Sequence, residues 1–228
     1  MFYFIDLILV NCELINNHME RKSAAGTTRN KERSKQKFLE AVGTILKTEG
    51  YAGLKVNTIA ATAGVDKKMI YKYFGGTEQL IDEYINSQDF WSNVKGDITE
   101  IKDGGQELSK QSLTQQFDYV AQNKNLQKIV LWGLAEKRAS LKHIADEREA
   151  TGELLLTQIT DPYFGENATE YRAIMAILIS GIYYLNMYKG VNGNTFCGID
   201  LTQETGTNEI KNALEKLIDL VYQDQKRD

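Results

Sequence analysis

Apolar residues recur at helical spacing along most of the chain. In residues 29–49 the apolar positions follow steps of three and four, which predicts an amphipathic helix that ends at Gly50. Two short helices are predicted next, over 56–63 and 67–73, and a longer one begins at Gly76 or Thr77. Further helices are predicted over 108–122, 126–136, 140–160, 167–189 and 208–225, with a loop at 193–198. Pro162, the single proline, is expected to end the 140–160 helix. The fold class is therefore all-α, with about nine helices.

The two short helices around Gly64 are the most informative part of the sequence. Glycine permits a tight turn between them, and Asp66 can cap the second helix with its carboxylate. The pair is expected to pack through Ile59, Ala60, Ala63, Val65 and Ile70. This pattern is typical of a helix-turn-helix, whose second helix lies in the major groove of DNA. The exposed face of that helix is expected to carry Lys67, Lys68, Met69, Lys72 and Tyr73.

The charge distribution supports an anionic partner at one end of the chain. The formal net charge is only −4. However, residues 19–76 hold twelve Lys and Arg against five Asp and Glu, a net charge of +7, whereas residues 77–228 have a net charge of −9. A basic segment on an acidic body is typical of nucleic-acid binding. The alternative is chance clustering of charge.

Several short motifs resemble those of TetR-type repressors. They are Ile59-Ala60, Ala63-Gly64-Val65, Ile70-Tyr71-Lys72-Tyr73-Phe74 and Leu80-Ile81, and the resemblance covers residues 31–91. It implies a ligand-responsive repressor that binds a palindromic operator as a homodimer. The chain departs from the family pattern at Gly76-Thr77, where Ser-Lys is frequent, and at Lys55-Val56, where Ser or Thr often caps the helix.

The resemblance also implies a division into domains. We expect a leader or arm at 1–28, a DNA-binding domain at 29–76 with its helix-turn-helix at about 54–74, and a connecting fourth helix at 77–92. Residues 93–228 are expected to form a helical effector-binding and dimerisation domain. Residues 1–18 are expected to be upstream sequence read from an early start, because Met19 opens the basic segment. The apolar run 1–10 is too short for a membrane span and lacks the features of a signal peptide.

The predicted DNA contacts extend beyond the lysines. By position in the family motif, Tyr73 is expected to contact phosphate and Tyr71 to be partly structural, although both could simply pack the small domain. Asn57 and Thr58 could donate to the DNA backbone. A basic arm toward the minor groove or a plain flexible tail is expected from Arg29, Lys31 and Arg33.

The C-terminal helices are expected to serve dimerisation and effector binding. The helices at 167–189 and 208–225 carry the predicted homodimer interface, with Gly181 allowing close approach of a partner. Aromatic residues suit an apolar pocket, so a small hydrophobic or aromatic effector is expected, with core packing as the alternative. The predicted pocket residues are Trp91, Phe117, Trp132, Tyr183, Tyr184 and Met187.

The sequence gives little support for catalysis. Its two histidines, His18 and His143, lack a second ligand at metal-binding spacing, and Cys197 lies in a Gly-rich stretch without a nearby base. We therefore predict no catalytic residue, no cofactor and no metal. An enzyme, or a helical adaptor without a role on DNA, is the alternative. Two cysteines, Cys12 and Cys197, give no disulfide framework and are typical of a cytoplasmic protein.

Overall fold

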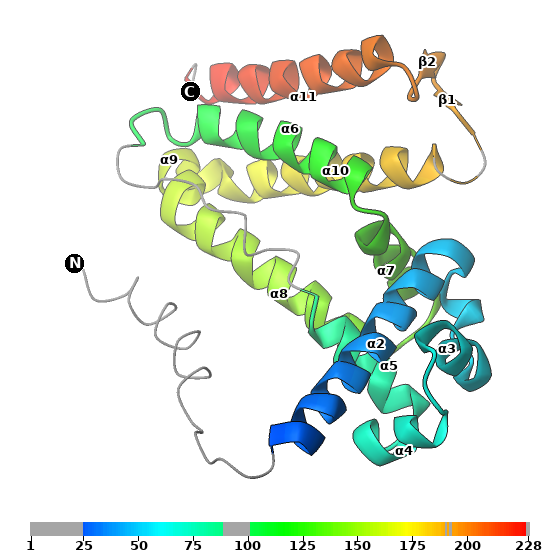
Figure 1. Ribbon diagram of the computed structural model, residues 1–228. Coiled ribbons are helices and arrows are strands. Elements are labelled where there is room, and N and C mark those ends of the chain that lie inside the picture. The colour runs from blue at the N-terminus through cyan, green and yellow to red at the C-terminus, as the bar shows by residue number, and fades with distance from the viewer. Residues whose placement is uncertain (1–24, 89–100, 190, 192, 227–228) are drawn as a thin grey trace.

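The computed structural model describes residues 25–88, 101–189, 191 and 193–226. These residues form two helical domains that meet at one corner (Figure 1), which confirms the predicted all-α fold. The N-terminal domain comprises α2 (Ala25–Glu49), the 3-10 turn η1 (Tyr51–Gly53), α3 (Val56–Ala63), α4 (Lys68–Phe74) and α5 (Thr77–Asn86). The C-terminal domain comprises α6 (Gln106–Gln122), α7 (Lys124–Ala135), α8 (Ala139–Leu155), α9 (Asp161–Phe164), α10 (Ala168–Tyr188) and α11 (Glu204–Gln225). The predicted leader up to residue 24, and Trp91, lie outside the described residues.

The N-terminal domain is held together by the apolar stripes of its helices. Helix α2 packs against α3 and α5, and its buried side chains meet those of Ile59, Ile70 and Leu80, all three fully buried. Gly64 adopts a left-handed conformation (φ 62°) between α3 and α4, a geometry that an L side chain disfavours. The predicted helix-turn-helix packing is confirmed, since Ala63 is buried and Val65 packs against the same core.

The C-terminal domain is built around α6, which packs between α10 and α11. The three helices run nearly alongside one another, while α8 crosses below them toward the N-terminal domain (Figure 1). Its core is apolar because each helix turns one stripe inward. The most buried residues of this core are Leu113, Phe117, Val120, Ile182, Ile218 and Tyr222.

The end of α8 differs from the predicted simple stop at Pro162. Helix α8 ends at Leu155, a π-helical turn follows at Leu156–Thr160, and α9 begins at Asp161 with Pro162 in its first turn. Proline is tolerated there because the first backbone N–H groups of a helix have no intrahelical acceptor. Proline therefore starts a new helix here instead of only ending the old one.

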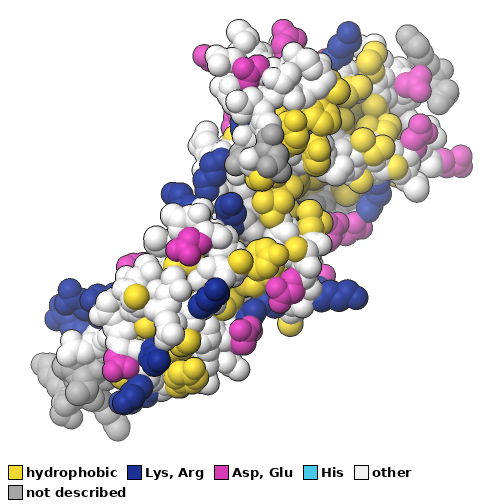
Figure 2. Space-filling model, turned by 90° about the vertical axis from the view of Figure 1, so that its right-hand side faces the viewer, with side chains coloured by type: hydrophobic (Ala, Val, Ile, Leu, Met, Phe, Trp, Pro, Cys, Tyr) yellow, Lys and Arg dark blue, Asp and Glu magenta, His cyan; other side chains and the backbone are white. Residues whose placement is uncertain are grey.

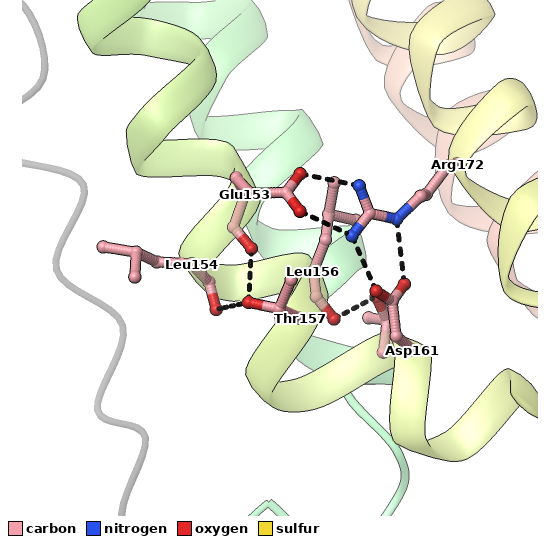
Figure 3. A network of polar contacts seen from close by, with 7 residues as sticks. Glu153, Leu154, Leu156, Thr157, Asp161 and Arg172 are labelled. Carbon is pink, nitrogen blue, oxygen red and sulfur yellow. Dashed lines mark hydrogen bonds and ion pairs between the residues drawn. The ribbon is translucent and has the colours of Figure 1, made fainter.

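Arg172 of α10 fixes this corner (Figure 3). Its guanidinium donates to both carboxylate oxygens of Glu153 at 2.6 and 3.0 Å and to both of Asp161 at 3.0 and 2.6 Å. Hydrogen bonds from Arg172 lower the pKa of the Asp161 carboxyl. Two bidentate contacts specify geometry as well as attraction, so α8, α9 and α10 are joined at one point.

The predicted loop at 193–198 overlaps a small β-hairpin, which extends to Asp200. Strands β1 (Thr195–Phe196) and β2 (Ile199–Asp200) pair antiparallel, and Cys197 and Gly198 form the two-residue turn with φ values of 50° and 80°. Positive φ at both central residues is the type I′ geometry that matches strand twist. Such short strands give too brief an alternation of polar and apolar residues to be recognised in the sequence.

The two domains are joined by polar and aromatic contacts from α7 and α8. Arg138, at the start of α8, donates from Nε to Asp82 of α5 at 2.6 Å and from Nη1 to Glu78 at 2.8 Å. The ring of Trp132 stacks on Tyr51 of η1, with centroids 5.4 Å apart and planes 7° from parallel. The N-terminal domain is thereby attached both at α5 and at the end of α2.

Candidate nucleic-acid interface

Helix α4 forms the outer edge of the N-terminal domain, at the end farthest from α10 and α11 (Figure 1). Ile70 is fully buried and anchors the helix, and Met69 packs partly against the same core. Lys68, Tyr71 and Lys72 are exposed. The short helix therefore presents a face of long donor side chains while its inner face holds it in place.

Asp66, Lys67 and Asn57 organise the start of α4. The Asp66 carboxylate accepts a hydrogen bond from the backbone N–H of Lys68 at 2.8 Å, as the sequence predicts for a capping residue. Nζ of Lys67 donates to Oδ1 of Asn57 at 3.2 Å. Two of the predicted DNA contacts, on different helices, are thus brought together on one exposed surface.

The two tyrosines of α4 have different surroundings. Tyr71 is 56% exposed, whereas Tyr73 is half-buried and packs against the domain core. Nζ of Lys31 lies 5.9 Å from the Tyr73 ring centroid, within the range of a cation–π contact. Tyr71 is predicted to be partly structural, but Tyr73 is the more buried of the two and suits that role better.

The predicted arm at Arg29, Lys31 and Arg33 is part of a regular helix. Helix α2 begins at Ala25, so these residues are not a flexible tail. The stretch after Gly26 has no proline and is rich in Lys, Arg, Glu and Gln, which lose little rotamer freedom in a helix. As a consequence, α2 holds Lys31 beside Tyr73, a contact that the sequence did not predict.

The surface around α4 is positively charged. Among the described residues, Lys67, Lys68, Lys72 and Lys31 make no ion pair with a carboxylate. Lys35 does so, with Glu83 at 2.9 Å. Unpaired ammonium groups are available to phosphate oxygens, and they attract DNA over a distance set by salt.

The departures from the family pattern are also visible. Lys55 occupies the position before α3 without a side-chain capping bond, and Thr58 is half-buried. Gly76 precedes α5 in an extended conformation, and Glu78 in the first turn of α5 is held by Arg138. No lysine stands at the start of α5 to reach a phosphate; the exposed lysines of this surface are Lys67, Lys68 and Lys72, at the start of α4 and along it.

The predicted effector residues have separate surroundings. Trp132 donates from Nε1 to Glu136 at 2.8 Å and faces the domain junction. Phe117, Tyr183 and Met187 are buried in the C-terminal core, where burial raises the pKa of the Tyr183 hydroxyl. Tyr184 is 52% exposed and packs with Tyr188 and Phe196. An apolar effector pocket built from these residues stays a prediction.

The groups considered for catalysis lie apart. His143 is exposed, with Nε2 at 3.3 Å from Oε1 of Glu147, and Cys197 is exposed in the hairpin turn. Within the described ranges no three His, Cys, Asp or Glu side chains gather as a metal site would require. In the same ranges, no helix combines the length and apolar character that crossing a membrane needs.

This chain is similar to known regulatory proteins in sequence and in fold. Residues 38–84 match the family described as bacterial regulatory proteins, tetR family. The HTH-type transcriptional regulator YfiR of Bacillus subtilis (strain 168) is 20% identical over 183 residues, which cover 74% of this chain and 82% of YfiR. A Clostridium perfringens protein described as a fatty acid metabolism regulator has a similar fold, with a TM-score of 0.52 and 19% identity over 80% of this chain and 96% of that one. The family and the two proteins named above are all described as regulators, and none of the three is described as an enzyme.

Proposed function

We propose that this chain, a TetR-family transcriptional regulator, binds a palindromic DNA operator as a homodimer and represses transcription until a small effector releases it. The observation that carries the proposal is the exposed basic face of α4, where Lys67, Lys68 and Lys72 have no carboxylate partner among the described residues. Since its target is DNA, the proposed place of action is the cytoplasm.

The proposed contacts fall into two groups. Lys68, Tyr71 and Lys72 project from α4 toward base edges and phosphates of the major groove. Asn57 and Thr58, on α3, and Met69 and Tyr73, at the edges of α4, contact the DNA beside it. In the free protein the hydrogen bond to Asn57 holds the Lys67 ammonium on the DNA-facing surface. On binding, Lys67 donates to a phosphate oxygen instead.

A double variant tests this interface. Lys67→Ala with Lys68→Ala should weaken binding to the operator by more than about 30-fold, because each lost charge-assisted hydrogen bond to a phosphate costs about 1 kcal/mol or more. The slope of log affinity against log salt should also become shallower by about 3.6, because the dimer loses two phosphate contacts in each subunit, at about 0.9 for each contact. Both side chains are exposed, so the thermal unfolding midpoint should stay within about 1 °C.

The measurement is fluorescence anisotropy with labelled DNA from upstream of the chain's own gene, at several salt concentrations. Lys137→Ala with Lys142→Ala, two exposed lysines outside α4, α10 and α11, is the matched control for lost charge. Equal operator affinity in the test and control variants would show that α4 is not the reading helix.

The proposed homodimer uses exposed apolar faces of α10 and α11. Ile177 is 70% exposed, Leu220 49% and Leu217 43%, and a Cβ added at Gly181 would meet only open space. Figure 2 shows hydrophobic side chains gathered in a band over the C-terminal domain. Contiguous exposed apolar surface is unusual on a monomer and marks an interface. Leu214 and Ile218, on the opposite face of α11, are buried within the chain and belong to its own core.

The effector response follows from the proposed repressor role. A ligand changes operator affinity only if it binds two states of the protein with different affinity. The predicted ligand is small and hydrophobic or aromatic. A thermal-shift screen of lipophilic compounds, followed by operator titration with each compound that stabilises the fold, tests this; stabilising compounds that leave operator affinity unchanged would contradict it.

A further inference from the structure

Three aromatic side chains form an exposed cluster at one end of the C-terminal domain. They are Tyr184 and Tyr188 of α10 and Phe196 of β1, and their ring centroids lie 5.5–5.9 Å apart. Tyr184 and Phe196 are exposed, and among the described residues the Tyr184 hydroxyl makes no hydrogen bond. Aromatic side chains are enriched where proteins contact one another. This aromatic cluster is therefore a candidate contact with another protein.

The β-hairpin holds the aromatic cluster in a fixed place. Leu201, directly after β2, is buried, and its backbone N–H donates to the Asn194 carbonyl at 2.8 Å. Gly206 of α11 lies so close to the hairpin that a Cβ there would overlap the Asp200 carbonyl. Because the cluster is ordered before a partner arrives, little conformational entropy is lost on association.

The aromatic cluster continues an exposed apolar face of α10 and α11. Residues 173–188 of α10 contain no charged side chain, although only part of the helix surface is buried within the chain. A helix without a charged side is expected to be covered on every side. Both helices pack on α6, and their exposed residues recur at steps of four, three and four, so each contributes one stripe. The stripes are Ala173, Ile177, Ser180 and Tyr184 on α10, and Ala213, Leu217, Leu220 and Asp224 on α11.

A surface hollow of about 330 Å³ lies at the other end of this face. The hairpin and the C-terminal end of α11 are at opposite ends of the domain (Figure 1). Leu220 and Val221 offer apolar contacts for an aromatic ring, and the Asp224 carboxylate, which makes no ion pair among the described residues, can accept from a hydroxyl. The lining residues of the hollow are Leu220, Val221, Gln223 and Asp224.

Small residues mark the middle of the face. The rings of Tyr171 and Tyr222 are in contact, with centroids 5.9 Å apart, so these two residues lie at the same level of α10 and α11. The helices run in opposite directions. Gly181, ten residues after Tyr171, is thus about level with Ala213, nine residues before Tyr222. A Cβ at Gly181 would meet only open space, so a partner can approach closely here.

The aromatic cluster and the hollow lie at similar distances from this middle. Tyr188 is seven residues after Gly181, and Val221 is eight residues after Ala213. At 1.5 Å per residue each lies about 10–12 Å from the middle, in opposite directions. A twofold axis through the middle therefore places the cluster of one copy on the hollow of the other, twice. Such reciprocal contacts define a symmetric dimer, whereas an unrelated partner does not require equal distances.

We propose that a second copy of this chain covers this face, and that the aromatic cluster of each copy packs into the hollow of the other. A tyrosine hydroxyl of the cluster then donates to the carboxylate of Asp224 of the partner subunit. The inference rests on the proposed homodimer and adds the hairpin to its interface. Contacts at both ends of the face fix the angle between the subunits, and hence the separation of their α4 helices.

The size of the face suits a stable dimer. Helices α10 and α11 are each about 32 Å long and about 10 Å wide, so together they offer about 600–700 Å² in each copy. A standard interface buries about 800 Å² of each partner. The hairpin and its aromatic cluster supply the remaining area.

Sedimentation velocity without DNA, over a series of protein concentrations, tests the contribution of the cluster. Tyr184→Ala with Phe196→Ala should raise the dimer dissociation constant by at least about 100-fold, or about 2.8 kcal/mol, because four aromatic side chains leave the interface. Both side chains are exposed in one copy, so the circular dichroism spectrum should stay that of the wild type. Tyr71→Ala, an exposed tyrosine of α4, is the matched control and should dimerise like the wild type.

Cross-linking through Cys197, which follows Phe196 in the hairpin, gives a second measurement that does not depend on the aromatic variant. Gln223→Cys places a thiol beside the hollow, about 28 Å along α11 from the hairpin, so a two-carbon bismaleimide can join it only to Cys197 of the partner subunit. Glu215→Cys, exposed on the opposite side of α11, is the control. Cys12→Ser in every variant leaves Cys197 as the single native thiol.

Covalent dimers are expected from Gln223→Cys and not from Glu215→Cys. Absence of this difference, or equal dissociation constants for the aromatic double variant and Tyr71→Ala, would overturn the inference. If the wild type still dimerises and Leu217→Arg is monomeric, that failure concerns the hairpin alone and the proposed homodimer stands. A monomeric wild type would refute both.

Discussion

Replacing Arg138 should measurably loosen the junction between the two domains. Its side chain is only 11% exposed and makes three hydrogen bonds to α5: to Oδ1 of Asp82 at 2.6 Å, to Oε2 of Glu78 at 2.8 Å and to the Glu78 carbonyl at 2.8 Å. It also lies 5.4 Å from the ring of Trp132. Arg138→Ala removes all of these contacts at once.

The expected cost follows from the exposure of each partner. The Asp82 contact is charge-assisted but 42% exposed, which reduces its contribution to about 1 kcal/mol. The Glu78 carboxylate is 72% exposed and contributes about 0.5 kcal/mol, and the carbonyl contact a similar amount. The sum is about 2 kcal/mol. For a chain of this size it corresponds to a lower unfolding midpoint by about 4–8 °C.

The assay is thermal unfolding followed by circular dichroism at one fixed protein concentration, since a dimer's midpoint depends on concentration. Lys142→Ala is the matched control: Lys142 lies on the same helix and pairs with Asp146, but the two side chains are 75% and 60% exposed. Its midpoint should change by less than about 1 °C. Arg138→Lys should fall between the two, because an ammonium cannot reproduce the fork of the guanidinium. Similar midpoints for Arg138→Ala and Lys142→Ala would refute the assigned role of Arg138.

Three further outcomes are expected. Leu217→Arg should give monomers by light scattering while its circular dichroism spectrum stays close to that of the wild type. Ile218 is the fully buried neighbour, so Ile218→Arg should instead unfold the domain. Dimers of Leu217→Arg would contradict the proposed interface. Gly206→Ala should lower the free energy of unfolding in urea by more than about 2 kcal/mol, because the new Cβ would overlap the Asp200 carbonyl. Gly133→Ala, in open space on α7, should leave that free energy unchanged or raise it. Similar unfolding free energies for the two variants would contradict the described packing. Partial burial raises the pKa of Asp82, but hydrogen bonds from Arg138 and Ser140 outweigh it and lower the pKa overall. The stabilisation from the Arg138–Asp82 contact is therefore present above about pH 4 and is lost as the pH falls through the lowered pKa. The difference in unfolding midpoint between the wild type and Arg138→Ala should accordingly disappear in acid. A constant difference would exclude ionised Asp82 as the partner.

The sequence predicted the N-terminal domain well because its determinants are local. The apolar stripe of α2, the left-handed turn at Gly64 and the cap at Asp66 each depend on residues a few positions apart. The candidate interface followed from the same stretch, although the position of Lys31 beside Tyr73 did not, since that contact joins residues far apart in the chain.

In the C-terminal domain the helices were predicted from the sequence, but the contacts between them and with the other domain were not. The stacking of the Trp132 ring on Tyr51 in the other domain, for example, was not predicted. Pairings between residues far apart in the chain leave no periodic signal in one sequence. The hairpin turn at Cys197-Gly198 was missed for another reason: its strands have only two residues each.

The contact between Gly43 and Tyr84 has a mechanical consequence for the junction. A Cβ at position 43 would lie 2.9 Å from the Tyr84 hydroxyl oxygen, so the phenol ring fills the space that a side chain on α2 would occupy. The same oxygen receives the hydrogen bond from Asn125 of α7. Helices α2, α5 and α7 thus meet at one hydroxyl oxygen, and α5 cannot slide along α2 without displacing the ring. Helices α2 and α5 are therefore expected to move together when the helix-turn-helix changes its position relative to the C-terminal domain.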